Sequence, residues 1–238
     1  MVVNIGIDEV GCGALFGPLV VAACADTTGW RNEEVADSKT IRSERRRNKL
    51  AVEICQNMAW SLVAIPNTYL EHVGVRAALK DAYAKVIEQL AQRLVVGPDV
   101  QFSINLDGDL FDVVSFLKGR TGYAIRCMPK ADAKIFEVSA ASIVAKDSRD
   151  RWCHEIVGAY PTLGLYGIAE NKGYTSKIHD AALIQHGPTE WHRKTFVETR
   201  LRNLGAKGNE QNTVTAAAPI EPAGQPPQDV AVGDAGPD

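Results

Sequence analysis

GIDEVGCGALFGPLVVAA, residues 6–23, carries the clearest information on fold class in this chain. It joins the end of a β-rich run, residues 2–10 (VVNIGIDEV), to a second run, residues 19–25, which Pro18 introduces. Both runs are predicted to be strands. The glycine-rich connection between them is too short for the crossover that parallel neighbours require. The two strands are therefore expected to pair antiparallel.

Strand and helix signals alternate over the rest of the body. Alternating apolar residues predict that residues 100–107 (VQFSINLD) form a strand that ends at Asp107. Further strands are expected at residues 60–65 and 123–128, and helices at residues 43–58, 68–93, 133–156, 175–186 and 189–204. A strand meander followed by strand-helix-strand units predicts an α/β fold, with helices packed on a mixed sheet.

The chain is predicted to contain one domain, residues 1–204, and a disordered tail, residues 205–238. The tail is rich in Ala, Pro and Gly, and it has one lysine and five acids, a net charge of −4. Because the whole chain carries −3, the body carries +1. Residues 171–204 hold six Lys/Arg against three acids, so a basic, phosphate-binding face is compatible with the sequence.

Other protein classes are disfavoured by composition. The longest apolar stretch, residues 15–25, contains a glycine and a proline and is shorter than the roughly 20 residues of a membrane helix. The N-terminus has no basic region typical of a secretory signal, so a cytoplasmic location without membrane contact is expected. Five cysteines without a C-x-x-C pair indicate reduced thiols, and neither a disulfide framework nor a zinc site.

Four acids fall at predicted strand ends or in the loops after them: Asp8, Glu9, Asp107 and Asp132. Each has an ordinary alternative. Asp107 with Gly108 is a common turn, Asp132 is suited to cap the next helix, and Asp8 with Glu9 fits a solvated strand end. Asp8 is the hardest to explain this way, because it interrupts the apolar run of a strand that should be buried.

Adjacent residues on a regular strand point to opposite faces, so Asp8 and Glu9 share one site only if the backbone departs from regular geometry at Glu9. Gly11 and Gly13 supply local freedom. Four converging carboxylates would repel one another unless cations neutralise them. Hard oxygen ligands select Mg²⁺ or Mn²⁺, and two such ions about 4 Å apart are suited to phosphodiester cleavage.

Seven segments together resemble the type 2 ribonucleases H, meaning ribonuclease HII of bacteria and archaea. They occur in the family's order and cover nearly all of residues 1–200: GIDEVGCGALFGPLVVAA at 6–23, DSK at 37–39, LDG at 106–108, KAD at 130–132, SAASIVAKDSRD at 139–150, NKGYTSKIH at 171–179 and HRKTF at 192–196.

The resemblance implies a ribonuclease H-like fold: a five-stranded mixed sheet, three strands antiparallel and two parallel, flanked by helices and followed by a C-terminal helical extension. It implies that Asp8, Glu9, Asp107 and Asp132 are catalytic ligands of two Mg²⁺ or Mn²⁺ ions. Asp150 is a rival for the fourth position, but it lies deep in a predicted helix and is expected to be an ion-pair partner.

The implied substrates are RNA/DNA hybrids and duplex DNA that contains ribonucleotides, cut to 5′-phosphate and 3′-hydroxyl ends by a monomeric endonuclease. The ribose 2′-hydroxyl would be read by the backbone of Gly11, Cys12 and Gly13, with Tyr174 against the same sugar. Taken alone, the glycines fit a tight turn and Tyr174 a half-buried core position. Weaker candidates for phosphate contacts are Lys39, Ser142, Lys146 and Arg193.

The chain departs from the family's pattern at two of these positions. Cys12 stands where the family usually has arginine, so a guanidinium contact to phosphate is lost. Asn171 replaces a histidine that two-metal hydrolysis does not need. Two rival functions remain open from sequence: a DNA junction resolvase or transposase-like nuclease, for which a ribose reader has no use, and a non-catalytic hybrid-binding protein, in which clustered acids would repel phosphate.

Overall fold

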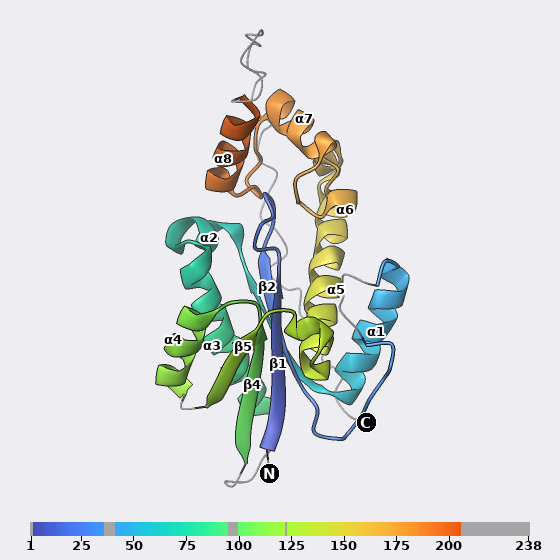
Figure 1. Ribbon diagram of the computed structural model, residues 1–238. Helices are drawn as coiled ribbons and strands as arrows, with labels where there is room; N and C mark the ends of the chain where they lie inside the picture. Colours follow the sequence, from blue (N-terminus) through green and yellow to red (C-terminus); the bar gives the residue numbers. More distant parts are fainter. Residues whose placement is uncertain (1, 36–40, 95–99, 122, 206–238) are drawn as a thin grey trace.

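The computed structural model describes residues 2–35, 41–94, 100–121 and 123–205. Its centre is a five-stranded sheet in the order β3-β2-β1-β4-β5 (Figure 1). The strands are β1 (Val2–Val10), β2 (Leu19–Ala25), β3 (Ala59–Ile65), β4 (Gln101–Asp107) and β5 (Ala124–Met128). β1 and β3 each pair antiparallel with β2, whereas β4 pairs parallel with β1 and with β5. The predicted mixed sheet is confirmed.

Helices cover both faces of the sheet and continue beyond one end of it (Figure 1). Their bounds are α1 (Glu44–Asn57), α2 (Asn67–Val73), α3 (Val75–Arg93), α4 (Phe111–Thr121), α5 (Phe136–Ala159), α6 (Ile168–Asn171), α7 (Lys177–His186) and α8 (Lys194–Gly205). Two 3₁₀ turns, η1 (Ala131–Ala133) and η2 (Pro161–Tyr166), flank α5. The final helices form the predicted C-terminal extension.

Strand alternation separates the hydrophobic core into two layers. Val3, Ile5 and Ile7 of β1 lie in the layer shared with α3 and α4. Val20, Ala22 and Cys24 of β2 lie in the layer shared with α1 and α5. A third cluster joins the residues after β1 to the C-terminal extension and includes Leu15, Phe16, Ile156, Tyr166 and Val197.

The two central elements, β1 and α5, approach closely because of Gly6. A Cβ built on Gly6 would lie 2.1 Å from the Glu137 carbonyl carbon and from the Val138 nitrogen, both backbone atoms of α5. No side chain larger than hydrogen fits there. This contact fixes the position of α5 along β1.

One expectation about helices was wrong, and one helix was missed. Residues 68–93 form two helices, because Gly74 adopts φ +80° and ends α2 before α3 begins. α4 was not predicted at all. Three of its side chains are buried, Val113, Val114 and Leu117, and the adjacent valines favour a strand by intrinsic preference.

Three further expectations concern the chain as a whole. Among the described residues, no helix has both the length and the apolar character of a membrane span. All five cysteines are free, as predicted. The predicted tail, residues 205–238, lies outside the described residues except for Gly205, which ends α8.

Candidate active site

Asp8 and Asp107 are neighbours at the carboxyl ends of the two central parallel strands. Each follows a paired residue by one position, because Ile7 of β1 is in register with Leu106 of β4. Paired strands lie about 4.8 Å apart, and residues in register on parallel strands point to the same face. The structure therefore brings these two predicted ligands together. Their shared face is the one covered by α5, since Ile7 and Leu106 both pack on the other face.

Asp132 joins this region through the 3₁₀ turn η1. The Ala131 amide donates a hydrogen bond of 2.7 Å to Oδ1 of Asp107, which fixes the turn on the end of β4. Lys130 adopts the left-handed conformation at φ +60°, and the Ser139 hydroxyl of α5 donates to the Asp132 carbonyl. Asp132 is buried, at 2% exposure. Its alternative role as a helix cap is not observed, because α5 begins at Phe136 after Ile135.

Glu9 occupies the opposite face of β1. The strand ladder continues regularly past it, with Glu9 opposite Val21 and Val10 opposite Val20. The backbone departure that would bring it to the side of Asp8 is therefore absent here. The Tyr83 hydroxyl of α3 donates a hydrogen bond to Oε2 of Glu9, and the Cys12 thiol lies 3.8 Å from Oε1.

The three carboxylates at the strand ends still interact electrostatically. Burial, together with the negative charges of Glu9 and Asp107, raises the pKa of Asp8 to about 8, although a hydrogen bond from Ser142 acts in the opposite direction. Burial also raises the pKa of Glu9; the Tyr83 hydrogen bond opposes this effect and the charge of Asp107 adds to it. A nearby cation would favour the ionised form of all these groups.

The chemistry of these side chains fits a hard divalent cation, because every candidate ligand is a carboxylate oxygen. The arrangement is not closed around an ion: within the described ranges, no three His, Cys, Asp or Glu side chains are grouped so as to hold a metal. Glu9, directed towards Tyr83, is the member that lies apart. Asp8 and Asp107 are the two carboxylates that the strand register places side by side.

Two of the residues predicted to contact the ribose, Gly11 and Tyr174, also lie together. The Gly11 amide donates a hydrogen bond of 3.0 Å to the Tyr174 hydroxyl, across 163 residues of sequence. Gly11 has φ +96°, a backbone conformation that residues with a side chain rarely adopt, so the fold itself accounts for glycine at this position. Gly13 is exposed, and a Cβ on it would meet nothing within 4 Å. Burial raises the pKa of the Cys12 thiol to about 12, so this side chain is neutral.

The four candidates for phosphate contacts have different positions. Ser142 is 4% exposed and bonds to Asp8, and Arg193 is fully buried with its guanidinium on backbone carbonyls, so both side chains bind groups within the protein. Lys146 remains partly exposed beside Asp150, at 2.8 Å. Lys39 lies outside the described residues. Asp150 is the structural ion-pair partner that was expected, since it also binds Arg47 at 2.6 Å.

Four residues around the site were not singled out from sequence: Tyr83, Arg149, His179 and His192. Tyr83 lies within the helix predicted at residues 68–93 and Arg149 within a quoted motif, and neither was given a role. His179 and His192 are buried and lie 3.0 Å apart through their Nε2 atoms. Burial lowers the pKa of both, to about 3 for His192. Periodicity shows that a residue is buried but not which polar atom it meets.

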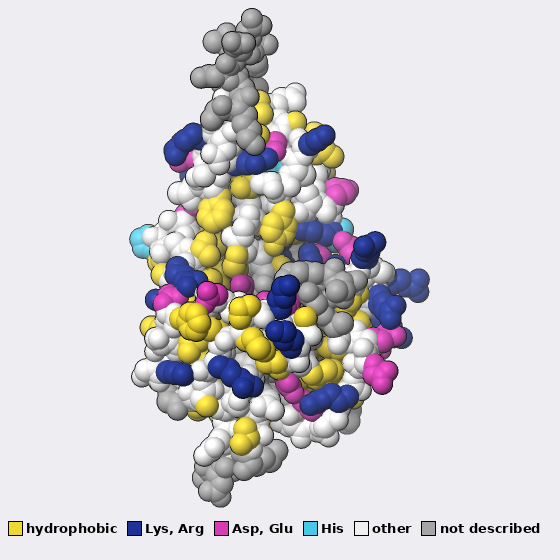
Figure 2. Space-filling view, in the orientation of Figure 1, with side chains coloured by type: hydrophobic (Ala, Val, Ile, Leu, Met, Phe, Trp, Pro, Cys, Tyr) yellow, Lys and Arg dark blue, Asp and Glu magenta, His cyan; other side chains and the backbone are white. Residues whose placement is uncertain are grey.

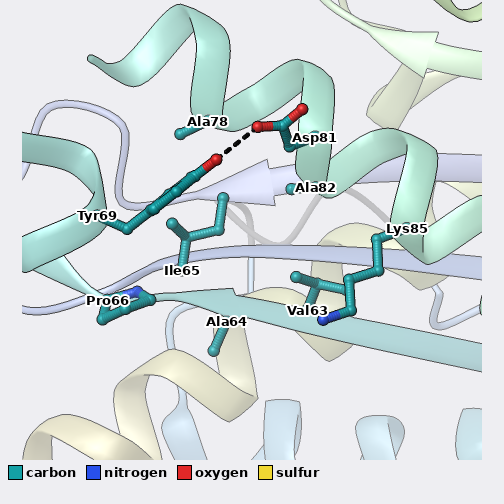
Figure 3. Close-up of a pocket in the computed structure, with 9 residues that line it drawn as sticks. All are labelled: Val63, Ala64, Ile65, Pro66, Tyr69, Ala78, Asp81, Ala82 and Lys85. Atoms are coloured by element: carbon teal, nitrogen blue, oxygen red, sulfur yellow. Dashed lines mark hydrogen bonds between the residues drawn. The ribbon is translucent and has the colours of Figure 1, made fainter. Parts of the chain in front are cut away.

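The molecular surface is consistent with a site at the strand ends. Acidic side chains gather at mid-height of the face in Figure 2, below the C-terminal helices, with Lys and Arg side chains beside them. A separate pocket of about 240 Å³ lies between β3 and helices α2 and α3, where the Tyr69 hydroxyl bonds to Asp81 at 2.7 Å (Figure 3). None of the candidate ligands lines it, so we do not place the active site there.

Comparison of the folds gives the protein class. The crystal structure of ribonuclease H2 from Pyrococcus horikoshii OT3 superimposes with a TM-score of 0.66 and 25% identity, and the match covers 84% of this chain and 99% of that one. A mixed five-stranded sheet of this order, with carboxylates ending its central parallel strands, is thus a ribonuclease H-like fold.

Sequence comparison narrows the class to a family. The profile of the family described as Ribonuclease HII matches residues 5–202. A curated ribonuclease HII from Aliarcobacter butzleri is 35% identical over 84% of this chain and 92% of its own length. Another, from Acidothermus cellulolyticus, is 36% identical over 82% of this chain, which spans only 59% of that relative. The chain belongs to the ribonuclease HII family.

Proposed function

We propose that this protein is an endonuclease that hydrolyses the RNA strand of RNA/DNA hybrids, including single ribonucleotides embedded in duplex DNA. The products would be 5′-phosphate and 3′-hydroxyl ends. The observation that carries the proposal is the adjacency of Asp8 and Asp107 at the carboxyl ends of β1 and β4, with Asp132 tied to Asp107 through Ala131. Membership of the ribonuclease HII family supports the same activity.

Asp8, Asp107 and Asp132 would provide oxygen ligands from a rigid sheet end, and Glu9 would complete the set after leaving Tyr83. Two Mg²⁺ or Mn²⁺ ions bound there would activate the attacking water and stabilise the leaving 3′-oxygen. Ser142 orients the Asp8 carboxylate from α5. The raised pKa of Asp8 and of Glu9 supports this assignment, because burial first and repulsion between carboxylates second disfavour their ionised forms, and a bound cation would offset both effects.

Recognition of RNA is assigned to residues 11–13 and Tyr174. Gly13 is the informative position, because neither a positive φ nor a neighbouring atom demands glycine there. Open space at its Cβ position leaves room for the backbone to approach a ribose 2′-hydroxyl. Cys12 offers no charge to a phosphate, so backbone contacts would account for most of the recognition at this loop.

One assay tests the proposed activity. The full-length protein is incubated with a DNA duplex that carries one ribonucleotide, with and without Mg²⁺ or Mn²⁺, and the cut is mapped. We expect metal-dependent cleavage at the ribonucleotide, and loss of cleavage in Asp8→Asn. Equal cleavage of an all-DNA duplex would instead support a junction nuclease. Hybrid binding without cleavage at any metal concentration would support a non-catalytic role.

A further inference from the structure

Two fully buried arginines lie beneath the loop that connects β1 to β2. Arg149 comes from α5 and Arg193 directly precedes α8, and both are 0% exposed. No ion pair of either guanidinium with a carboxylate is found in the part of the chain that the structure describes. Burying a cation is costly unless its donors are satisfied, so the groups that accept from these arginines are informative.

Arg193 binds both ends of this loop. Its Nη1 donates to the carbonyls of Gly11, at 2.7 Å, and Cys12, at 3.2 Å. Its Nε and Nη2 both donate to the carbonyl of Gly17, at 3.0 and 2.9 Å. A planar guanidinium presents donors in a fixed geometry, so these contacts hold the two ends of the loop at a set separation.

Arg149 connects the same loop to the segment that carries Tyr174. Its three nitrogens donate to the carbonyls of Pro18, Phe16 and Lys172, at 3.0, 2.9 and 2.7 Å. Its guanidinium lies 5.2 Å from the centre of the Tyr174 ring. It also packs against Gly11, because a Cβ there would come within 2.5 Å of Nε.

The backbone completes the connection between loop and extension. Leu15 donates to the Gly173 carbonyl at 2.8 Å, and the Arg193 amide donates to the Leu15 carbonyl at 2.8 Å. Each partner of the hydrogen bond between the Gly11 amide and the Tyr174 hydroxyl also contacts an arginine: Arg193 binds the Gly11 carbonyl, and Arg149 lies over the Tyr174 ring. Neither arginine has any surface through which it could touch substrate.

We propose that Arg149 and Arg193 are positioning residues that hold the Gly11–Gly13 backbone and Tyr174 in their ribose-reading arrangement before substrate binds. The inference rests on the proposed function, since it concerns how that reader is built. Preorganisation of this kind raises discrimination between ribose and deoxyribose, because substrate binding does not have to order the loop. The arginines therefore act on the choice between ribose and deoxyribose and leave the carboxylates unaffected.

The test compares Arg193→Lys with wild type. Lysine keeps the positive charge but cannot span the carbonyls of Gly11 and Gly17 with one planar group. Affinities for an RNA/DNA hybrid and for an all-DNA duplex of the same sequence are measured without divalent metal, so that the substrates stay intact. Amide exchange of residues 11–13 is followed by mass spectrometry in the free protein. We expect faster exchange and a fall of about tenfold in the ratio of hybrid to DNA affinity, equivalent to about 1.4 kcal/mol.

Arg47→Lys is the matched control, because Arg47 is another buried arginine but binds the Ile41 carbonyl and Asp150. It should reduce stability without changing the affinity ratio. If Arg193→Lys does not fold, Arg149→Lys loses the simultaneous contacts to the carbonyls of Pro18, Phe16 and Lys172 and should lower the ratio in the same way. Faster exchange with an unchanged ratio would overturn the inference. A wild-type protein that binds both duplexes equally would overturn the proposed function instead.

Discussion

Gly11 and Gly13 are two residues apart, yet the structure requires glycine at only one of them. Gly11 has φ +96°, and a Cβ there would lie 2.5 Å from Arg149 Nε and 2.8 Å from the Pro18 carbonyl oxygen. Gly13 has open space around the same position. The fold therefore requires glycine at position 11 and leaves position 13 free to vary, so we expect any effect of a side chain at position 13 to fall on substrate binding.

This difference predicts opposite outcomes for two alanine variants. Gly13→Ala should change the free energy of unfolding by less than about 0.5 kcal/mol but weaken hybrid binding about tenfold. Gly11→Ala should destabilise the protein by about 1–3 kcal/mol, because it places a side chain at positive φ against buried atoms. Urea unfolding and hybrid titration separate the two effects. Full hybrid affinity in Gly13→Ala would remove the main support for reading of the ribose at this position.

At the residue scale, sequence identified the carboxylates but not the groups that control them. Asp8 stood out because a charge interrupts an apolar strand, and Asp107 because it ends an alternating one. Nothing in the pattern distinguishes Tyr83, which binds Glu9, from the other buried residues of α3. Likewise, the burial of Arg193 depends on carbonyls more than 170 residues away. Such partners depend on tertiary packing.

At the element scale, the close packing of α5 on β1 positions the site. Gly6 allows the contact, and two residues later Asp8 receives a hydrogen bond from Ser142 of α5. The strands were predictable because alternation and the Asp107 boundary are local features. The break at Gly74 was not, because a single glycine within a helical pattern is usually tolerated.

A methyl group at Gly6 should separate these elements. Gly6→Ala places a Cβ 2.1 Å from the Glu137 backbone, so α5 has to move, and we expect a loss of about 1–3 kcal/mol in unfolding free energy. Gly158→Ala is the control, because Gly158 lies on the same helix with nothing within 4 Å of its Cβ position. It should be neutral or slightly stabilising. Equal stability of both variants in urea would contradict this account of the contact.

At the scale of the whole molecule, the C-terminal extension contains a buried pair of histidines, His179 and His192, and the His192 ring packs on Phe16 of the loop after β1, with ring centroids 5.1 Å apart. Their hydrogen bonds assign neutral tautomers to both rings. His179 Nδ1–H donates to the Tyr174 carbonyl at 2.9 Å, the Thr189 amide donates to His192 Nδ1 at 3.0 Å, and His192 Nε2–H donates to His179 Nε2 at 3.0 Å. A proton added to His179 Nε2 would face the His192 Nε2–H, and one added to His192 Nδ1 would face the Thr189 amide, so each would place two donors against each other.

This pair predicts a loss of stability in acid. An unfolded histidine binds a proton near pH 6.5, whereas burial lowers the pKa of His192 to about 3. Between these values the unfolded chain holds more protons, so stability falls as pH decreases, by up to about 1.4 kcal/mol per pH unit for this residue. Above pH 6.5 the pair has no such effect. Asp8 acts in the opposite sense, because its pKa is raised, so wild type alone is not informative.

The informative quantity is the difference in unfolding free energy between wild type and His192→Gln, measured in urea at several pH values. Glutamine retains a donor for His179 but does not titrate. The advantage of wild type should be largest above pH 6.5 and shrink as pH falls towards 4.5, while the contribution of Asp8 cancels in the difference. A difference that stays constant across this range would show that His192 binds its proton as readily in the folded protein as in the unfolded chain, which would contradict a buried neutral pair.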